Sequence, residues 1–254
     1  MSNGTVNTSI QVIDRAAHLL DAIAKTDGTA SLKILSAETG LHPSTAHRIL
    51  AALSAHGLVE RDEAGQYRLG IALYGLASRV QKRIDLRKEA LPIMEQLRSQ
   101  IGETVNLTVR EGDEVVYVER ASSHKAIRVE QVIGSRAPLH VTAVGKLFLA
   151  HDGQEACLAY AQRSGLPAYT PNTLADPSRL WEEATHALRQ GHALDNEEAE
   201  PGVGCIAVPV VDAGGKMVAG LSISAPIQRR KSEWIPLMIE AGTRLSSRLG
   251  ARAE

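Results

Sequence analysis

Apolar residues recur with helical spacing through the first 55 residues of the chain. A first helix is expected after a candidate cap at Ser9, with a buried face formed by Val12, Ala16, Leu19, Leu20 and Ile23. A short second helix would begin at Ser31 and end at Gly40, because glycine accepts the left-handed conformation that closes a helix. A third would open at His42-Pro43, where proline suits the first turn, and would bury Ala46, Ile49, Leu50 and Leu53.

The outward face of the third predicted helix is small, polar and basic near its start. It carries Ser44, Thr45, His47 and Arg48. A recognition helix needs such side chains, because short hydroxyls and an arginine reach base edges and phosphates in the major groove. An ordinary solvated amphipathic helix also has a polar face, so this helix alone does not decide the function.

The segment after this helix has the pattern of a β-hairpin. Strand-like runs at 58–61 and 66–69 flank a short turn. Arg61 and Arg68 are expected to point outward and to contact phosphates, which adds affinity but little sequence information. Three helices followed by a basic hairpin predict a winged helix-turn-helix that binds double-stranded DNA.

These patterns suggest domain boundaries. We expect a flexible tail at 1–8, the winged helix-turn-helix at 9–70 and a linker helix at 71–84. The linker carries Ile71, Tyr74 and Leu76, which are apolar enough to pack against the winged domain or a second subunit.

The remainder, residues 85–254, has the mixed pattern of an α+β domain with an antiparallel sheet flanked by helices. Helices are expected at 85–101, where Pro92 would kink or break the helix, at 143–150, 153–163, 176–190 and 232–249. Strands are expected at 104–110, 115–120, 127–131, 191–195, 204–211 and 216–225. In the first of these strands, Val105, Leu107 and Val109 alternate with polar residues, as in a half-buried strand.

Composition adds modest information. The net charge of the chain is −1, but the charge is unevenly distributed. Residues 1–83 carry nine Lys/Arg against seven Asp/Glu, whereas the rest of the chain carries 19 against 22. The positive charge of the N-terminal part fits a segment that faces DNA. There is no apolar signal core and no run of 18 apolar residues, so no membrane association is expected. Cys157 and Cys205 have no disulfide or metal spacing, which predicts a reducing cytoplasm, no metal and no cofactor.

Polar residues in the second half suggest a ligand pocket. Ser222 and Ser224 share one face of a strand, Cys205 begins another strand, and Asp195 ends a third. The amides of Ala143 and Val144 precede a helix, where free N–H groups attract anions. This set would suit a small carboxylate, although Asp195 would have to accept a ligand hydroxyl or carry a proton. Each residue also has a simpler reading, since Cys205 could be a buried hydrophobe and the serines could face solvent.

Several motifs together resemble the IclR family of bacterial transcription regulators over roughly residues 9–250. They are Val12–Ala16, Gly40–Leu50, Tyr67–Gly70, Gly145-Lys146 and Pro201–Ala207. The resemblance implies a winged helix-turn-helix, a linker helix and a GAF-like effector-binding domain. It also implies homodimers or homotetramers, as dimers of dimers, on operator DNA, and it covers both repressors and activators.

The resemblance further implies an effector site in which two backbone amides, an Asp, a Cys and two Ser hold a small acid. By position these are Ala143, Val144, Asp195, Cys205, Ser222 and Ser224. The family often has Gly-Ala where this chain has Ala143-Val144, so Val144 is expected to narrow or reshape the pocket. The effector class therefore stays open between small and aromatic carboxylic acids.

Three alternatives are weighed against this function. Cys205, Asp195 and His192 could form a catalytic trio, but no nearby base or helix N-terminus is evident to activate the thiol. His140, His192 and Cys205 could hold a metal, but no His/Cys pair has ligand spacing. A DNA-binding scaffold whose C-terminal domain only oligomerises remains the main alternative.

Overall fold

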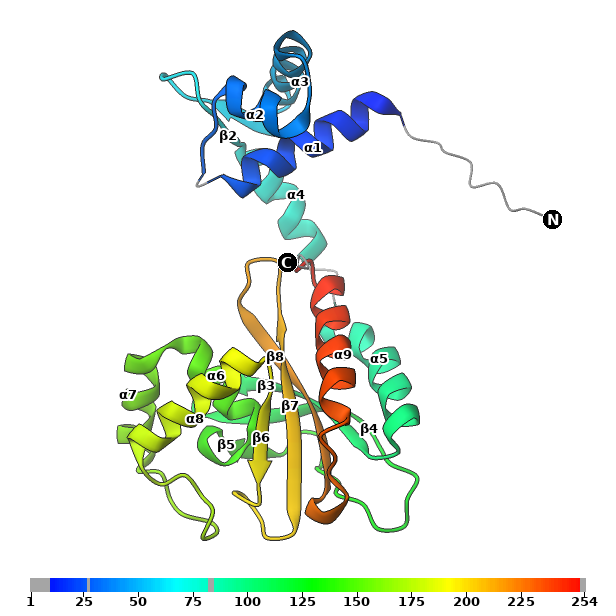
Figure 1. Cartoon of the computed structure of the whole chain (residues 1–254), viewed down its shortest axis with the longest axis vertical. Coiled ribbons are helices and arrows are strands. Elements are labelled where there is room, and N and C mark those ends of the chain that lie inside the picture. Colours follow the sequence, from blue (N-terminus) through cyan, green and yellow to red (C-terminus); the bar gives the residue numbers. More distant parts are fainter. Residues whose placement is uncertain (1–9, 27, 82–84, 252–254) are drawn as a thin grey trace, which may run out of the picture. The chain divides into compact units, whose positions relative to one another are not determined.

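The computed structural model describes residues 10–26, 28–81 and 85–251 (Figure 1). The chain divides into two compact units, Met1–Ile84 and Asp85–Glu254. The expected tail at 1–8, the cap at Ser9 and the last residues of the linker lie outside the described residues. No helix in the described part is long and apolar enough to cross a membrane.

The first unit contains three helices, a hairpin and a fourth helix. In order these are α1 (Gln11–Lys25), α2 (Leu32–Thr39), α3 (Pro43–Ala55), β1 (Val59–Arg61), β2 (Tyr67–Leu69) and α4 (Ile71–Gln81). The apolar faces meet in one core that includes Leu19, Ile23, Leu35, Leu50 and Val59. Gly40 has φ +66°, the left-handed conformation expected at the end of α2. This three-helix arrangement was predicted because its periodicity is local.

The apolar expectations in this unit were wrong in part. Val12 is 54% exposed, because the first turn of α1 extends beyond the helices that cover the rest of it (Figure 1). Ile71 and Tyr74 are 75% and 73% exposed, and Leu76 is exposed as well, so they do not pack on the winged domain. Of the two contacts expected for the linker, the one with the winged domain is therefore wrong, and the one with a second subunit stays a prediction.

The second unit is built on a six-stranded antiparallel sheet in the order β5-β4-β3-β8-β7-β6. Its strands are β3 (Thr104–Glu111), β4 (Glu114–Ala121), β5 (Arg136–Pro138), β6 (Ala193–Asn196), β7 (Val203–Val211) and β8 (Met217–Pro226). Its helices are α5 (Leu86–Ile101), α6 (Ala143–Asp152), α7 (Gln154–Ser164), α8 (Pro177–Gln190) and α9 (Trp234–Arg248), with 3-10 turns at Leu139–Val141 and Ile227–Arg229.

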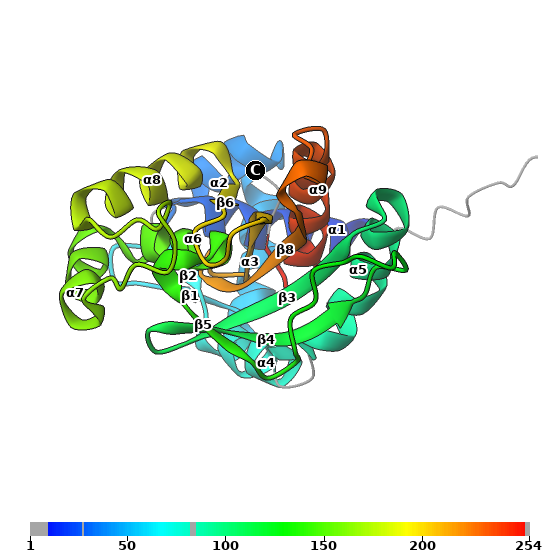
Figure 2. The same ribbon diagram turned by 90° about the horizontal axis from the view of Figure 1, so that it is seen from below.

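The helices cover both faces of this sheet (Figure 2). Helices α5 and α9 lie on one face, where Gly242 of α9 approaches Val208. Helices α6, α7 and α8 lie on the other, where Val144 of α6 touches Gly220. Because both faces are covered, Asn106 and Thr108 are buried, and the expectation of a half-buried first strand was wrong.

The strand expected at 127–131 is absent. Residues 122–135, which we call the strap, leave the sheet after β4 and return as β5, a strand that the sequence pattern did not reveal. The alternation that suggested a strand is real: Val129 and Gln131 are half-buried, whereas Arg128 and Glu130 are exposed and form an ion pair. Similarly, α5 continues through Pro92 without a break.

Candidate functional site

The outward face of α3 is exposed as expected. Ser44, His47 and Arg48 are exposed, and Thr45 is half-buried. The ring Nδ1 of His42 lies 3.4 Å from the Ser44 amide and 2.8 Å from its hydroxyl, so the imidazole caps the helix. The first turn of α3 is therefore held in place by the residues at its own start.

The two arginines of the hairpin have different surroundings. The Arg61 guanidinium stacks 5.4 Å from the centroid of the Tyr67 ring and donates to the Gly65 carbonyl at 3.2 Å. Arg68 donates to the Glu60 carboxylate at 2.8 and 3.0 Å, and this bond lowers the pKa of Glu60. The Arg61 guanidinium is not paired with any acidic group that the structure describes, whereas the Arg68 guanidinium is paired with a carboxylate.

In the second unit, strand register brings the predicted polar residues together. Asp195 pairs with Cys205, Cys205 with Ser224, and Ser224 with Thr104 across four strands. In the next row on the same face, Ser222 pairs with Asn106 and with Ala207. Directly opposed residues share a face of a sheet, so this polar row lies under α6. Ser222 and Ser224 are 5% and 1% exposed, which excludes the solvent-facing reading.

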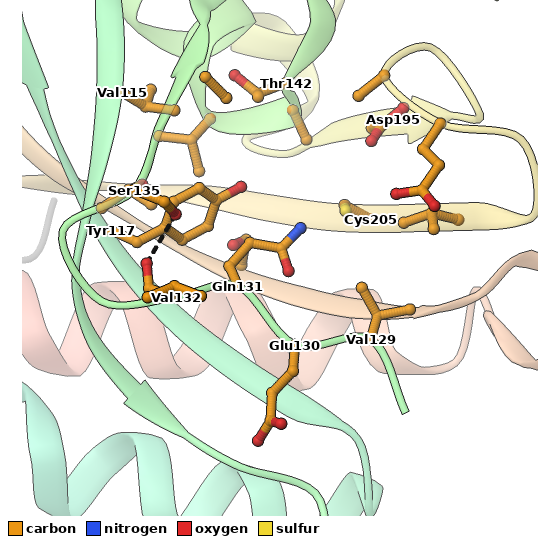
Figure 3. Close-up of a pocket in the computed structure, with 18 of the residues that line it drawn as sticks. Val115, Tyr117, Val129, Glu130, Gln131, Val132, Ser135, Thr142, Asp195 and Cys205 are labelled. Carbon is orange, nitrogen blue, oxygen red and sulfur yellow. Dashed lines mark hydrogen bonds between the residues drawn. The ribbon is translucent and has the colours of Figure 1, made fainter. Parts of the chain in front are cut away.

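A cavity of about 510 Å³ opens beside this polar row (Figure 3). Five of the six predicted effector residues line it: Ala143, Val144, Asp195, Cys205 and Ser222. Ser224 does not line it but lies 3.4 Å from the Cys205 sulfur, and its hydroxyl accepts from the Asn106 amide at 3.1 Å. The sixth residue therefore contacts Cys205, which lines the cavity, but does not line the cavity itself.

The first turn of α6 faces the cavity. Ala143 and Val144 are its first two residues, and Thr142 caps it by accepting from the Gly145 amide at 3.1 Å. The first amides of a helix have no acceptor within the helix, so those of residues 143 and 144 can bind an anion. Gly145 is required here, because a Cβ would lie 2.1 Å from the Leu139 carbonyl oxygen.

Val144 is accommodated by a glycine on the sheet. A Cβ at Gly220 would lie 2.4 Å from a Val144 methyl group, so the valine side chain packs onto the bare backbone of β8. Because part of the Val144 side chain occupies the space above Gly220, Val144 narrows the pocket less than the sequence suggests.

The charges beside the cavity are unusual. Burial is the main cause that raises the pKa of Asp195 to about 6; the Glu198 amide, which donates to the Asp195 carboxylate at 2.8 Å, opposes this shift, and the nearby Glu198 charge adds to it. Burial, together with Asp195, also raises the pKa of the Cys205 thiol, so the sulfur stays protonated. An uncharged Asp195 would remove the repulsion that a carboxylate ligand would otherwise meet.

Sequence reasoning missed a buried ion pair next to this site. The Lys146 ammonium lies 2.6 Å from a Glu198 carboxylate oxygen, and their side chains are 0% and 4% exposed. The other oxygen of Glu198 has no hydrogen-bond partner among the described residues. Only the Gly145-Lys146 motif hinted that Lys146 matters, and nothing in the sequence pattern joined it to a residue 52 positions later.

The alternative sites do not assemble. His192 contacts the Gln190 carbonyl at 3.2 Å, and His140 is buried between the Tyr160 hydroxyl at 2.8 Å and the Pro167 carbonyl at 3.1 Å. The Cys205 thiol is hydrogen-bonded to the Asp195 carboxyl and contacts the Ser224 hydroxyl, but burial and Asp195 raise its pKa, so this arrangement does not activate the thiol as a nucleophile. Within that part, no group of three His, Cys, Asp or Glu side chains could hold a metal ion.

Comparison with known proteins assigns the family. The IclR helix-turn-helix domain matches residues 12–63, and the domain described as bacterial transcriptional regulator IclR C-terminal matches residues 78–247. The chain is a member of the IclR family. This IclR regulator is 35% identical to the HTH-type transcriptional regulator BhcR of Paracoccus denitrificans, over 96% of this chain and 89% of BhcR. It is 33% identical to XynR of Escherichia coli, over 95% and 98% of the two chains.

Solved structures show the same fold. An IclR regulator from Silicibacter sp. TM1040 superposes with a TM-score of 0.86 at 25% identity, over 96% of this chain and 97% of that one. An IclR homolog from Microbacterium hydrocarbonoxydans, complexed with 4-hydroxybenzoate, gives a TM-score of 0.61 at 30% identity, over 94% and 98%. The members compared are named as regulators of transcription, including repressors such as IclR of Escherichia coli.

Proposed function

We propose that this IclR regulator binds operator DNA as a homodimer, or as a dimer of dimers, and that a small or aromatic carboxylic acid in the C-terminal cavity controls this binding. The observation that carries the proposal is the meeting of the α6 N-terminus with a cavity of about 510 Å³ beside a buried Asp195. Such a site offers amide donors to a carboxylate and removes water from around it.

For DNA, we assign base and backbone contacts to Ser44, Thr45, His47 and Arg48 of α3. Arg61 and Arg68 of the hairpin would contact phosphates. A dimer would place two α3 helices in successive major grooves, about 34 Å apart. The exposed Ile71, Tyr74 and Leu76 of α4 support a second subunit, because they form an apolar surface without cover in the described chain.

For the effector, we assign the carboxylate to the amides of Ala143 and Val144, with Ser222 beside it. Asp195 in its protonated form would donate to the ligand, and Cys205 and Ser224 would support this arrangement. The Microbacterium homolog with 4-hydroxybenzoate indicates that this fold can hold an aromatic acid. If an effector changes the affinity of the protein for its operator by some factor, then operator DNA must change the affinity of the protein for that effector by the same factor.

Two variants test this assignment with an operator selected from random duplexes. Arg48→Ala should weaken operator binding, followed by fluorescence anisotropy, by 100-fold or more, because a base contact and a charge are both lost (about 1–3 kcal/mol for the base contact alone). Arg179→Ala, which removes an exposed charge on α8, is the matched control and should bind normally. Unchanged operator affinity in Arg48→Ala would show that α3 is not the recognition helix.

The effector half is tested by a thermal-shift screen of small and aromatic acids. A ligand at 100 times its Kd stabilises the protein by about 2.7 kcal/mol, which gives a clear rise in melting temperature. The rise should vanish in the Ser222→Ala/Ser224→Ala double variant while operator binding persists. A screen without any hit, on protein that still binds DNA, would favour the scaffold function in which the C-terminal domain only oligomerises.

A further inference from the structure

The cavity is several times larger than a two-carbon acid requires. At about 30 Å³ per water molecule, its 510 Å³ corresponds to roughly 17 water molecules. A two-carbon oxo-acid of five non-hydrogen atoms would leave most of that space to water. An effector that fills the cavity has on the order of ten non-hydrogen atoms, and the remaining walls must contact more than its carboxylate.

Two further side chains point into the cavity from walls other than α6. Tyr117 comes from β4 and is held opposite Thr108 by the strand register, and Gln131 comes from the strap (Figure 3). The Tyr117 hydroxyl interacts with the Gln131 side chain, and both face Cys205 and Asp195 across the cavity. Neither residue belongs to the six-residue effector site described above.

The strap is held in place at Gln131, and the Tyr117 hydroxyl keeps its proton. The backbone carbonyl of Gln131 accepts from the Arg120 guanidinium, which anchors the strap where the side chain turns inward. Burial raises the pKa of the Tyr117 hydroxyl, and the nearby Cys205 and Asp195 raise it further, so this group stays a neutral donor. Tyr117 and Gln131 thus present a phenol and an amide, each able to donate and to accept.

The charges around the cavity argue against a second carboxylate on the ligand. Arg136 is paired with Glu111 and Glu114, and Arg128 is paired with Glu130. Glu200 lines the cavity as well and adds negative potential. Much of the remaining wall is apolar, with Val115, Val129, Val132 and Ala137, and its other polar side chains, Thr108, Ser135 and Thr142, are uncharged hydroxyls. Such a wall suits an apolar body carrying one neutral polar group.

We propose that Tyr117 and Gln131 determine effector specificity by binding a neutral hydroxyl group, so that the effector is a hydroxylated monocarboxylic acid with an apolar body. The hydroxyl would donate to the Gln131 amide oxygen and accept from the Tyr117 phenol. This inference rests on the proposed function, because it assumes that the carboxylate binds at the N-terminus of α6.

The test compares matched acids with and without a hydroxyl on the full-length protein. Isothermal titration would use benzoate against its 2-, 3- and 4-hydroxy forms, butyrate against 3- and 4-hydroxybutyrate, and glyoxylate as the short probe. At least one hydroxylated acid should bind about tenfold or more tightly than its parent, because the parent leaves buried polar groups unpaired. Glyoxylate should bind more weakly than that acid.

Variants of Tyr117 and Gln131 test whether these two side chains bind the hydroxyl group of the ligand. In Tyr117→Phe and Gln131→Leu the preference should fall to about threefold or less, mainly through weaker binding of the hydroxylated acid. Gln162→Leu on α7 is the matched control, since Gln162 is exposed and does not line the cavity, and it should keep the full preference. Gln131 lies outside the sheet, so Gln131→Leu tests the inference even if Tyr117→Phe folds poorly.

The outcomes separate this inference from the proposed function. If acids bind but parent and hydroxylated forms bind equally, or if both variants keep the preference, Tyr117 and Gln131 do not read a hydroxyl and the effector site still stands. The same holds if glyoxylate binds most tightly. If no acid binds to protein that still binds operator DNA, the proposed effector class is wrong and this inference is wrong with it.

Discussion

The α3 face and the C-terminal cavity are two sites of opposite construction in one chain. The α3 residues project from a helix whose core lies on its other side, so they touch little else in the protein. The cavity residues lie in the interior, where Asp195 and Ser222 also take part in the packing of the sheet. Changes on α3 should therefore alter function without altering stability, whereas changes around the cavity should alter both.

The Lys146–Glu198 pair offers the strongest test of this difference. Lys146→Met leaves a buried carboxylate without its partner, so we expect the free energy of unfolding to fall by about 3–5 kcal/mol. Urea denaturation of the full chain measures this loss. The exposed Lys216→Met is the control and should unfold like the wild type.

A double variant, Lys146→Met/Glu198→Leu, should recover most of the lost stability, because no charge stays buried. Equal stability of Lys146→Met and wild type would contradict the view that the buried Glu198 carboxylate depends on its partner.

The protonation of Asp195 predicts a pH dependence of effector binding. Burial raises its pKa in the folded protein to about 6, and a bound carboxylate favours the protonated form. Affinity for a carboxylic acid should therefore be constant below pH 6 and fall up to tenfold per pH unit above it, about 1.4 kcal/mol each. Titration calorimetry between pH 5 and 8 measures this slope.

Asp195→Asn is the control for that experiment, because an amide cannot titrate, and its affinity profile should be flat over the same range. A slope that persists in Asp195→Asn would assign the proton to another group. Operator binding by the wild type without effector should not follow this profile, because the α3 face contains no part of the cavity.

The hairpin provides the smallest expected effect. Glu60→Gln should release the Arg68 guanidinium from its ion pair. The glutamine keeps a side-chain oxygen that can accept from the Ile71 amide, as Glu60 does at 3.3 Å. Operator affinity should rise about threefold at low salt, and the slope of log K against log salt should steepen by about 0.9. The melting temperature should not change, because exposed ion pairs add little stability. Unchanged DNA affinity and salt slope would mean that Arg68 does not reach a phosphate.

The two sites also differ in how far the sequence predicts them. The helices of the first unit were predicted because residues three and four positions apart share a helix face. The Ser222–Ser224 face could be predicted from strand alternation, and the resemblance to a family supplied Asp195 and Cys205. These are properties of short segments or of motifs.

What was missed depends on contacts between distant segments. Gln131 was assigned to a strand because a half-buried segment shows the same alternation whether it lies beside another strand or beside a cavity. Asn106 was expected to face solvent because nothing local shows that α6 covers that side of the sheet. Ile71 and Tyr74 were expected to be covered, and the described chain supplies no cover for them.

The contact between Val144 and Gly220 has a consequence for the evolution and redesign of this site. The two positions lie on different elements, 76 residues apart, yet they share one small volume. Any larger residue at 220 would push residue 144 toward the ligand, and a smaller residue at 144 would leave a void above the glycine. Mutant libraries that aim to change the preferred acid should therefore vary both positions together, because a single replacement at either position would in most cases disrupt the packing of the pocket.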